Sequence, residues 1–303
     1  MFSIDEADPY HPTMVGDPVS TVGTFPQSVA YSPKHATGKS HASIVCSTLT
    51  APACVLNGGT VPGIACFSVK KSKGLHPIGR FRPIALNQTD PPLGPGGTVS
   101  DIRFNPSETA LFAAVKSDIG TIPGFIYAYP IDLFGSISTT PIVSRPADLI
   151  VDFGFSFLGH DSRGVVADAT YGASIIEISP TLEVNVVHKT TVPNQGAICW
   201  TVYSSFYDAI YLMDLVNSNI TVLDPKTGAI KGTIAQATSA LGSADTFIDR
   251  EWLYVLKSNP SISVIGDLGN IGKQVQSFDL SSLGSRQGYQ GFAVYPSLGD
   301  LGS

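Results

Sequence analysis

The chain has 303 residues, of which 43% are hydrophobic and only 14% are charged, against roughly 25% charged in an average globular protein. The formal net charge of −6 argues against nucleic acid as a partner, because neutralising phosphates takes clustered lysines and arginines, and the basic cluster at residues 70–74 is short. No run of 18 or more apolar residues occurs, so no membrane-spanning helix is predicted.

The N-terminal residues MFSIDEADP predict a β-strand that compares with FIYAYPID and SITVLDP later in the chain. We interpret it as the last strand of a sheet whose other strands are missing. The segment has neither the basic start nor the apolar core of a signal peptide. We therefore expect the chain to lack its natural N-terminus, with about two sheets and any signal peptide absent.

A repeated pattern follows: short apolar strands alternate with polar turns rich in Gly, Asn and Ser. Its copies begin near Ser28, Ser100, Asp152, Trp200 and Asp245, at spacings of 72, 52, 48 and 45 residues. A period of about 40–50 residues with three or four strands per copy is typical of a β-propeller. The alternative is a β-sandwich, but five copies of similar length favour the propeller. We predict one all-β domain over residues 1–303, with four-stranded antiparallel blades, about five of them and a fragment.

Residues 38–52, GKSHASIVCSTLTAP, interrupt the first copy, and the first spacing falls to 57 without them. The Gly-Lys-Ser at their start lacks the upstream glycine and the following helix of a phosphate-binding loop. A long surface loop is one explanation, since added loop residues cost little entropy. We favour translation of an unspliced intron, because Gly-Lys-Ser can be encoded by a sequence that contains a 5′ splice signal, and sequencing of the cDNA would test this.

Two sets of polar residues are expected on one face of such a fold. In an antiparallel meander, the turns between second and third strands lie at the same end as the entries into the first strands. The turns supply Asn57, Lys116, Asp168, Tyr171, Asp214, Asn217, Lys257 and Asn259. The entries supply Gln27, Ser100, Asp101, Gln195, Trp200 and Asp245. We expect both sets at one mouth of the central channel, a usual place for a ligand.

From these sets we predict catalytic roles for Lys116, Asp168, Gln195 and Asp214, and substrate-binding roles for Gln27, Tyr171, Trp200, Asp245 and Lys257. The carboxylates suit acid–base chemistry, because a carboxylate crowded by another one titrates high. The lysines suit stabilisation of an enolate or a carboxylate. The alternative for each residue is a turn position whose side chain bonds to local backbone. The histidines show no ligand spacing for zinc. Calcium held by carboxylates and carbonyls around the channel is an alternative, but our prediction is that the protein has neither a metal nor a cofactor.

The cysteines and the sequons carry weaker signals. Cys54 and Cys66 lie on either side of a hairpin-like segment and are placed to bridge across it, although pairing cannot be read from sequence alone. Asn87 and Asn219 each begin an Asn-x-Thr sequon for glycosylation, an indication of secretion.

Several phrases resemble the fungal secreted 3-carboxymuconate cyclase-like propellers, over almost the whole chain. They are SVAYSPKHA, ACVLNGG, PGIACFSV, TDPPLGPGGTVSDIRFNPSETALFAAVK, AICW and FDLSSLGSRQGYQGFAVYP. The resemblance implies a seven-bladed propeller, a secretory route and a disulfide between Cys54 and Cys66. The family includes fungal hetero-Diels–Alderases that join a tropolone-type quinone methide to the sesquiterpene humulene.

The resemblance therefore implies a cofactor-independent cyclase of fungal secondary metabolism, with polyketide and terpene substrates. Holding two partners in reacting geometry can lower a cycloaddition barrier by several kcal/mol. One alternative is a lactonase or a muconate-type cyclase, and another is a secreted binding propeller without enzymatic activity. No nucleic-acid or membrane partner is expected, and a homo-oligomer is left open.

Overall fold

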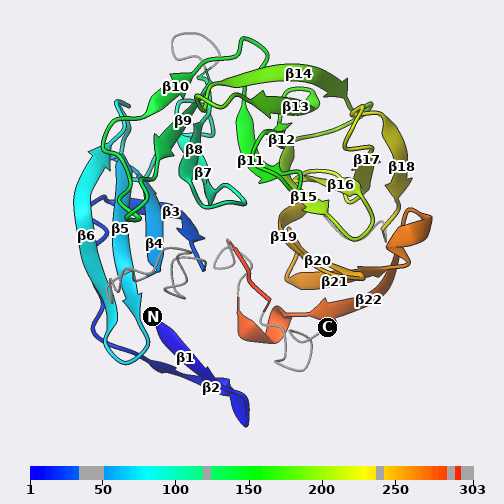
Figure 1. Ribbon diagram of the computed structural model, residues 1–303. Helices are drawn as coiled ribbons and strands as arrows, with labels where there is room; N and C mark the ends of the chain where they lie inside the picture. The colour runs from blue at the N-terminus through cyan, green and yellow to red at the C-terminus, as the bar shows by residue number, and fades with distance from the viewer. Residues whose placement is uncertain (34–50, 119–123, 237–241, 285–290, 295–303) are drawn as a thin grey trace. The chain divides into compact units, whose positions relative to one another are not determined.

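The computed structural model describes residues 1–33, 51–118, 124–236, 242–284 and 291–294. Within these residues the chain is all-β, with five four-stranded antiparallel sheets of the β-propeller type (Figure 1). The described part contains no helix long and apolar enough to cross a membrane. The contacts divide the chain into two compact units, Met1–Ser144 and Arg145–Ser303, which are described separately.

The first unit holds a hairpin and two blades. The hairpin consists of β1 (Phe2–Asp5) and β2 (Asp8–Met14). Blade one consists of β3 (Phe25–Tyr31), β4 (Pro52–Gly58), β5 (Gly63–Lys70) and β6 (Gly74–Pro83). Blade two consists of β7 (Val99–Phe104), β8 (Ala110–Val115), β9 (Phe125–Pro130) and β10 (Ile142–Ser144).

The second unit holds three blades. Blade three consists of β11 (Asp152–Phe157), β12 (Arg163–Asp168), β13 (Gly172–Ile178) and β14 (Val184–Thr191). Blade four consists of β15 (Ile198–Ser204), β16 (Ala209–Asp214), β17 (Ile220–Leu223) and β18 (Ile230–Ile234). Blade five consists of β19 (Ser243–Asp249), β20 (Trp252–Lys257), β21 (Ser261–Gly266) and β22 (Lys273–Asp279). A short 3-10 turn at Leu268–Asn270 lies between β21 and β22, and another at Ser281–Leu283 follows β22.

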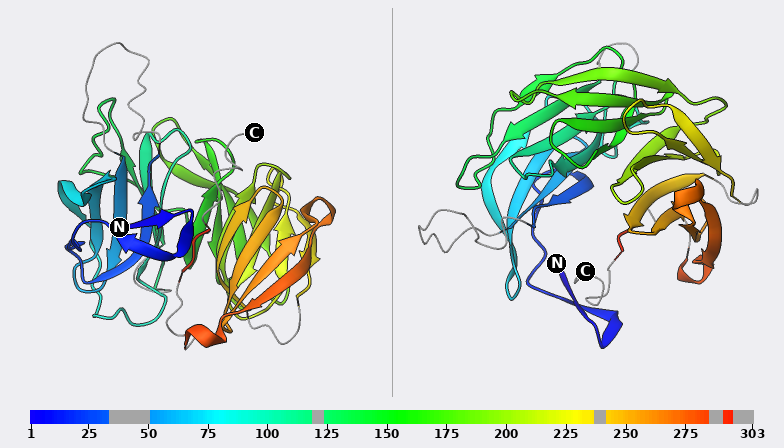
Figure 2. Two further views of the ribbon diagram at one scale, coloured as in Figure 1. Left: turned by 90° about the horizontal axis from the view of Figure 1, so that it is seen from below. Right: turned by 45° about the vertical axis from the view of Figure 1, so that its right-hand side comes forward.

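The core of each unit lies between neighbouring blades. The second strands β8 and β16 read ALFAAV and AIYLMD and are buried along their whole length, because both faces of these strands are covered. In unit two, residues of blades four and five such as Tyr211, Met213 and Val255 form one apolar cluster. Figure 2 shows these two sheets side by side, and their first strands β15 and β19 are in contact.

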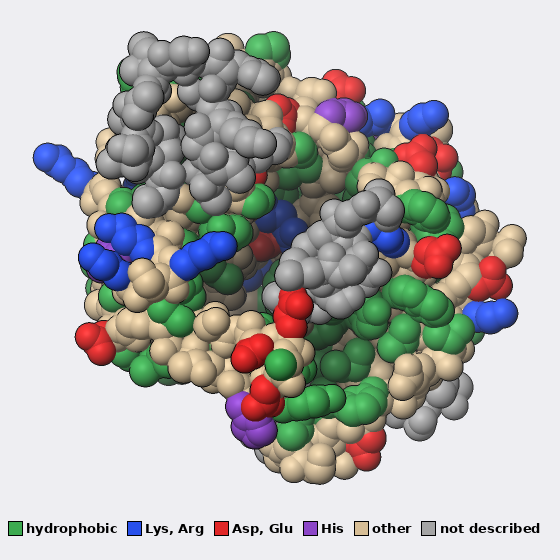
Figure 3. Space-filling model, turned by 60° about the horizontal axis from the view of Figure 1, so that its bottom comes forward, with side chains coloured by type: hydrophobic (Ala, Val, Ile, Leu, Met, Phe, Trp, Pro, Cys, Tyr) green, Lys and Arg blue, Asp and Glu red, His purple; other side chains and the backbone are tan. Residues whose placement is uncertain are grey.

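Fourth strands of the blades are more exposed than the second strands. β22 has one partly buried residue among exposed ones, and Phe278 is 55% exposed. Figure 3 shows apolar side chains at the surface on the face drawn there. In the hairpin, every residue of β1 and β2 is exposed, Tyr10 at 87%. The N-terminal strand pairs with β2, so it is the first strand of a hairpin, and the prediction that it is a last strand is wrong.

The segment predicted as an insert, residues 38–52, follows β3 in the chain and ends at the first residue of β4, Pro52. Residues 38–50 lie outside the described residues. The last two residues of the segment belong to blade one, because the carbonyl of Pro52 accepts a bond from Ser32 N and that of Ala51 accepts one from Val69 N, each 3.0 Å long.

Candidate functional site

One buried polar position recurs in every blade, at the end of the second strand. Its residues are Asn57, Lys116, Asp168, Asp214 and Lys257, none more than 3% exposed. In each blade the side chain bonds to residues on the way into the first strand or at its start, as the meander argument predicts for the two ends. The position therefore ties the strand-two turn to the start of the blade.

In blade three this position is Asp168. One carboxylate oxygen accepts hydrogen bonds from the backbone N–H groups of Ile150 and Val151, at 2.8 and 3.0 Å. The other accepts from the N–H and the hydroxyl of Thr170, at 2.9 and 2.6 Å. Four donors at a fully buried carboxylate make Asp168 a structural clamp within its blade.

In blade four the same role falls to Asp214. Its carboxylate accepts bonds from the N–H groups of Gly196, Ala197, Val216 and Asn217, at 2.6 to 3.0 Å. Burial opposes the charge, but these bonds together outweigh it and lower the pKa of Asp214 below its usual value. The expectation that crowding raises this pKa is wrong here, because backbone donors and not another carboxylate surround the group.

In the first unit the position holds a lysine and an asparagine. Lys116 donates from Nζ to the carbonyl of Val99, at 2.8 Å. Asn57 accepts from Thr21 Oγ1 at 2.7 Å and donates to the carbonyls of Thr21 and Gly63. Both side chains therefore bond to residues of their own unit.

In blade five the position is Lys257, which is completely buried. Its Nζ donates to the carbonyl of Ser218, Oε1 of Gln236 and Oγ of Ser243, at 3.3, 3.0 and 3.2 Å. Desolvation by burial lowers the pKa of Lys257 to about 8.

Gln195 and Tyr171 also bond to their surroundings. Gln195 donates to the carbonyl of Ala169 at 3.1 Å and accepts from Ile198 N at 2.9 Å, so it links blades three and four. The Tyr171 hydroxyl donates to the carbonyl of Asp148 at 2.9 Å, and burial raises its pKa. Lys189 Nζ lies 4.1 Å from the centre of the Tyr171 ring, in a cation–π contact.

A second recurring feature is a bulge near the start of each first strand. The register of β3, β7, β11, β15 and β19 against the second strand shifts there in all five blades. The residues in or just after the bulges are Ser28, Asp101, Gly154, Trp200 and Asp245. Bulges are frequent beside active sites, because they redirect individual side chains.

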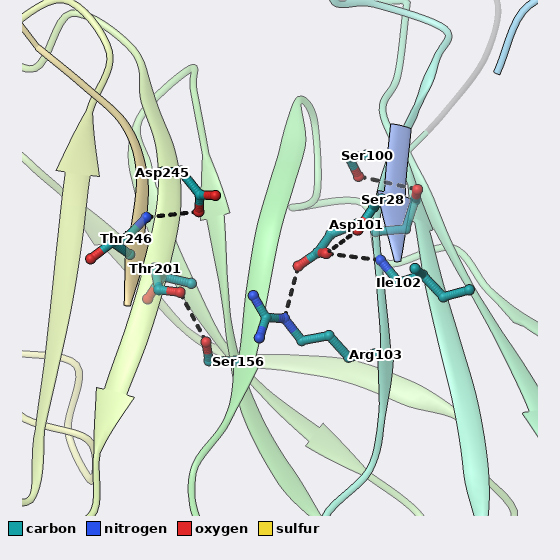
Figure 4. A network of polar contacts seen from close by, with 10 residues as sticks. Ser28, Ser100, Asp101, Ile102, Arg103, Ser156, Thr201, Asp245 and Thr246 are labelled. Carbon is teal, nitrogen blue, oxygen red and sulfur yellow. Dashed lines mark hydrogen bonds and ion pairs between the residues drawn. The ribbon is translucent and has the colours of Figure 1, made fainter. Parts of the chain in front are cut away.

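In unit one this level of the first strands forms a charged cluster that the sequence analysis did not select as a unit (Figure 4). Ser28 Oγ donates to Asp101 Oδ1 at 2.9 Å, which links β3 to β7. Ile102 N donates to the same oxygen at 2.9 Å, and Arg103 Nε donates to Oδ2 at 2.8 Å. The Asp101 side chain is 5% exposed and that of Arg103 is 43% exposed. Alternation along β7, which puts residues 101 and 103 on one side, is the sequence signal for this pair.

The bulge residues of unit two are Gly154, Trp200 and Asp245, of which Asp245 is charged. A Cβ on Gly154 would collide with the indole ring of Trp200, so the absence of a side chain lets β11 approach the ring. Asp245 accepts bonds from Thr246 N at 2.7 Å and Phe292 N at 2.9 Å. Figure 4 shows Asp245 with Thr246, and Ser156 Oγ donating to the carbonyl of Thr201 at 2.9 Å.

The remaining predicted residues lie elsewhere. Gln27 is exposed on β3. Asn87, after β6, and Asn219, in the turn before β17, are both exposed, as a glycan would require. Cys54 and Cys66 are directly opposite on β4 and β5 and are joined by a disulfide inside the apolar core of unit one. The described residues contain no group of His, Cys, Asp and Glu arranged to hold a metal ion.

Comparison with known proteins supports the fold. No protein-family model matches the chain, and no curated protein matches it either. A protein of Bacteroides fragilis described as a "putative 6-phosphogluconolactonase" is 10% identical, with a TM-score of 0.63 over 92% of this chain and 76% of that one. One from Bacteroides uniformis with the same description is 12% identical, with a TM-score of 0.58 over 75% and 68%.

A further similar structure comes from a nidogen–laminin complex. It is 12% identical to this chain, with a TM-score of 0.55 over 86% of this chain and 82% of that one. At these identities the likeness shows a shared propeller fold and does not assign an activity.

Proposed function

We propose that the chain is an enzyme of the lactonase or cyclase type, which opens or closes a ring in a small organic molecule. The proposal rests on one observation: every first strand bulges near its start, and the bulges carry chemically different residues. A bulge redirects individual side chains and is frequent beside active sites, which makes these positions the candidates for contact with a substrate.

The candidate substrate-contacting residues are therefore those on the first strands. In the first unit, Gln27 remains from the predicted set and Arg103 joins it. In the second unit, Trp200 and Asp245 remain from the predicted set. The strand-end residues Asp168 and Asp214 act in this proposal as supports, because backbone donors occupy their carboxylates. The two similar structures described as "putative 6-phosphogluconolactonase" agree with this class of activity.

The finer form of the proposal is an intermolecular hetero-Diels–Alder reaction between a tropolone-type quinone methide and humulene. The resemblance of several sequence phrases to fungal cyclase-like propellers favours it, and the partly exposed Trp200 offers an apolar surface to a terpene. Catalysis would come from holding two partners in reacting geometry, so no cofactor is invoked. Secretion and glycosylation at Asn87 and Asn219 belong to the same proposal.

The test is a product assay on the purified full chain with three substrate classes. These are sugar-acid lactones with and without a phosphate, carboxylated muconates, and humulene with a quinone methide generated in the assay. We expect one class to give ring-opened or ring-closed product above the buffer rate, and Trp200→Ala to reduce it. A correctly folded chain that accelerates none of the three would overturn the enzymatic proposal and favour a binding propeller.

A further inference from the structure

We propose that Arg103 binds an oxyanion of the ligand, a carboxylate or a phosphate, and that Asp101 is the positioning residue that orients its guanidinium. The inference rests on the proposed function for its location on the first strands. It goes further by naming the chemical class of the ligand.

Arg103 is exceptional among the first strands. In β3, β7, β11, β15 and β19, all within the described residues, it is the one lysine or arginine. The chain as a whole is acidic, with a net charge of −6, so a cation at this level is a local departure from the general charge. The Arg103 side chain is 43% exposed, which leaves it open to a ligand.

The bond to Asp101 uses only part of the guanidinium. Nε donates to Asp101 Oδ2 at 2.8 Å, the dashed contact between the two residues in Figure 4. Within the described part of the chain neither terminal nitrogen has a hydrogen-bond or ion-pair partner. Two parallel N–H groups of this kind match the two oxygens of a carboxylate or a phosphate.

The carboxylate of Asp101 is itself held in place. It is almost fully buried and accepts bonds from Ser28 Oγ and Ile102 N on the oxygen that does not contact Arg103. The guanidinium is therefore anchored at Nε before a ligand arrives, which reduces the entropy that binding would otherwise cost. A neutral carbonyl offers the two donors a single oxygen and no negative charge, whereas an oxyanion offers one oxygen to each donor and a charge, so the guanidinium favours an oxyanion.

The experiment measures binding directly, by calorimetry on the full chain, with inorganic phosphate and with muconate as separate probes. The two arms distinguish a phosphate ligand from a carboxylate ligand. Arg103→Gln should lower the affinity for the preferred probe about 10- to 100-fold, the usual contribution of a charge-assisted hydrogen bond. Arg103→Lys should restore part of the affinity, because it keeps the charge but loses the fork.

Arg80→Gln is the matched control. Arg80 is exposed on β6 of the same unit, and its substitution removes the same charge. Ser28→Ala tests the positioning role of Asp101. It leaves Arg103 unsubstituted but removes one bond that holds the Asp101 carboxylate, so the affinity for the anion should fall several-fold. Thermal unfolding of each variant confirms folding.

The outcomes separate this inference from the proposed function. Equal affinities for the Arg103→Gln and Arg80→Gln variants, or no saturable binding of either anion, would overturn it even if the protein turns over a neutral substrate. Arg103-dependent anion binding without turnover of any ring substrate would uphold it, and the enzymatic proposal would then fail alone.

Discussion

Ser28 on β3 donates a 2.9 Å hydrogen bond to the buried carboxylate of Asp101 on β7. These residues are 73 positions apart in the sequence. The bond connects the first strands of blades one and two at their bulges, and the same carboxylate holds Arg103. The Asp101 side chain therefore both connects the two blades and orients Arg103, the residue proposed to bind the ligand.

Ser28→Ala should lower the free energy of unfolding by about 0.5–1.5 kcal/mol, because it removes one hydrogen bond to a carboxylate that keeps two other donors. Urea unfolding followed by circular dichroism would measure the change. Ser72→Ala, in the exposed turn after β5, is the control and should stay within error of the parent protein. A Ser28 variant as stable as the Ser72 variant would show that the bond does not couple the blades.

Asp214→Asn should destabilise the protein by about 2–4 kcal/mol at pH 7, because an amide cannot accept all four backbone N–H bonds that the carboxylate accepts. The folded-state pKa of Asp214 is lowered, so its contribution is complete above the usual aspartate pKa of about 3.9. The contribution disappears as the pH falls from there through the folded-state value.

Unfolding free energies at several pH values would check this. The difference between parent and Asp214→Asn should shrink on acidification below about pH 4. Asp17→Asn, at an exposed position, should show little difference at any pH. A constant difference down to pH 2 would contradict a lowered pKa.

The blades could be predicted because their signal is local. Strands such as ALFAAV and AIYLMD repeat at a regular spacing, and turn residues separate them. The shared location of Asp214 and the entry to β15 could also be predicted, since a meander brings those ends together. The role of Asp214 could not, because it depends on which backbone N–H groups reach the carboxylate.

Arg103 was missed for a related reason. Functional residues were predicted in turns and strand entries, and Arg103 lies inside a strand. Its significance comes from the salt bridge to Asp101 and from the partial exposure of its side chain. Alternation along β7 places the two residues on one side of the strand, but it predicts neither the bond nor the exposure. The bulges could not be predicted from the sequence either, because a register shift depends on how a strand pairs with its partner strand.

Lys257→Met should alter how stability changes with alkaline pH. The folded-state pKa of about 8 lies below the usual lysine value, so the folded protein releases this proton before the unfolded chain does. The cost of burying the charge is therefore complete below about pH 8 and is relieved as the pH rises toward 10.5. Relative to the variant, the free energy of unfolding of the parent should rise by on the order of 3 kcal/mol over that range.

Chemical unfolding of both proteins between pH 7 and pH 10.5 would measure this gain. The informative quantity is the difference in unfolding free energy between the parent and Lys257→Met. Each protein's own stability at high pH also depends on buried tyrosines such as Tyr211, whose pKa is raised to about 12 by burial. Lys71→Met, at an exposed position, is the control. A parent-minus-variant difference independent of pH would rule out a depressed Lys257 pKa.

Gly154→Ala tests the contact between blades three and four. A methyl group there would overlap the ring of Trp200, so we expect a loss of about 1–3 kcal/mol and a displaced indole. Tryptophan fluorescence in a Trp252→Phe background would report the displacement, since the chain has two tryptophans.

Adding Trp200→Leu to Gly154→Ala should recover part of the stability, because the smaller side chain leaves room for the methyl group. Strictly additive effects in this double-mutant cycle would mean that residues 154 and 200 do not interact, and that the indole is free to serve a ligand without support from β11.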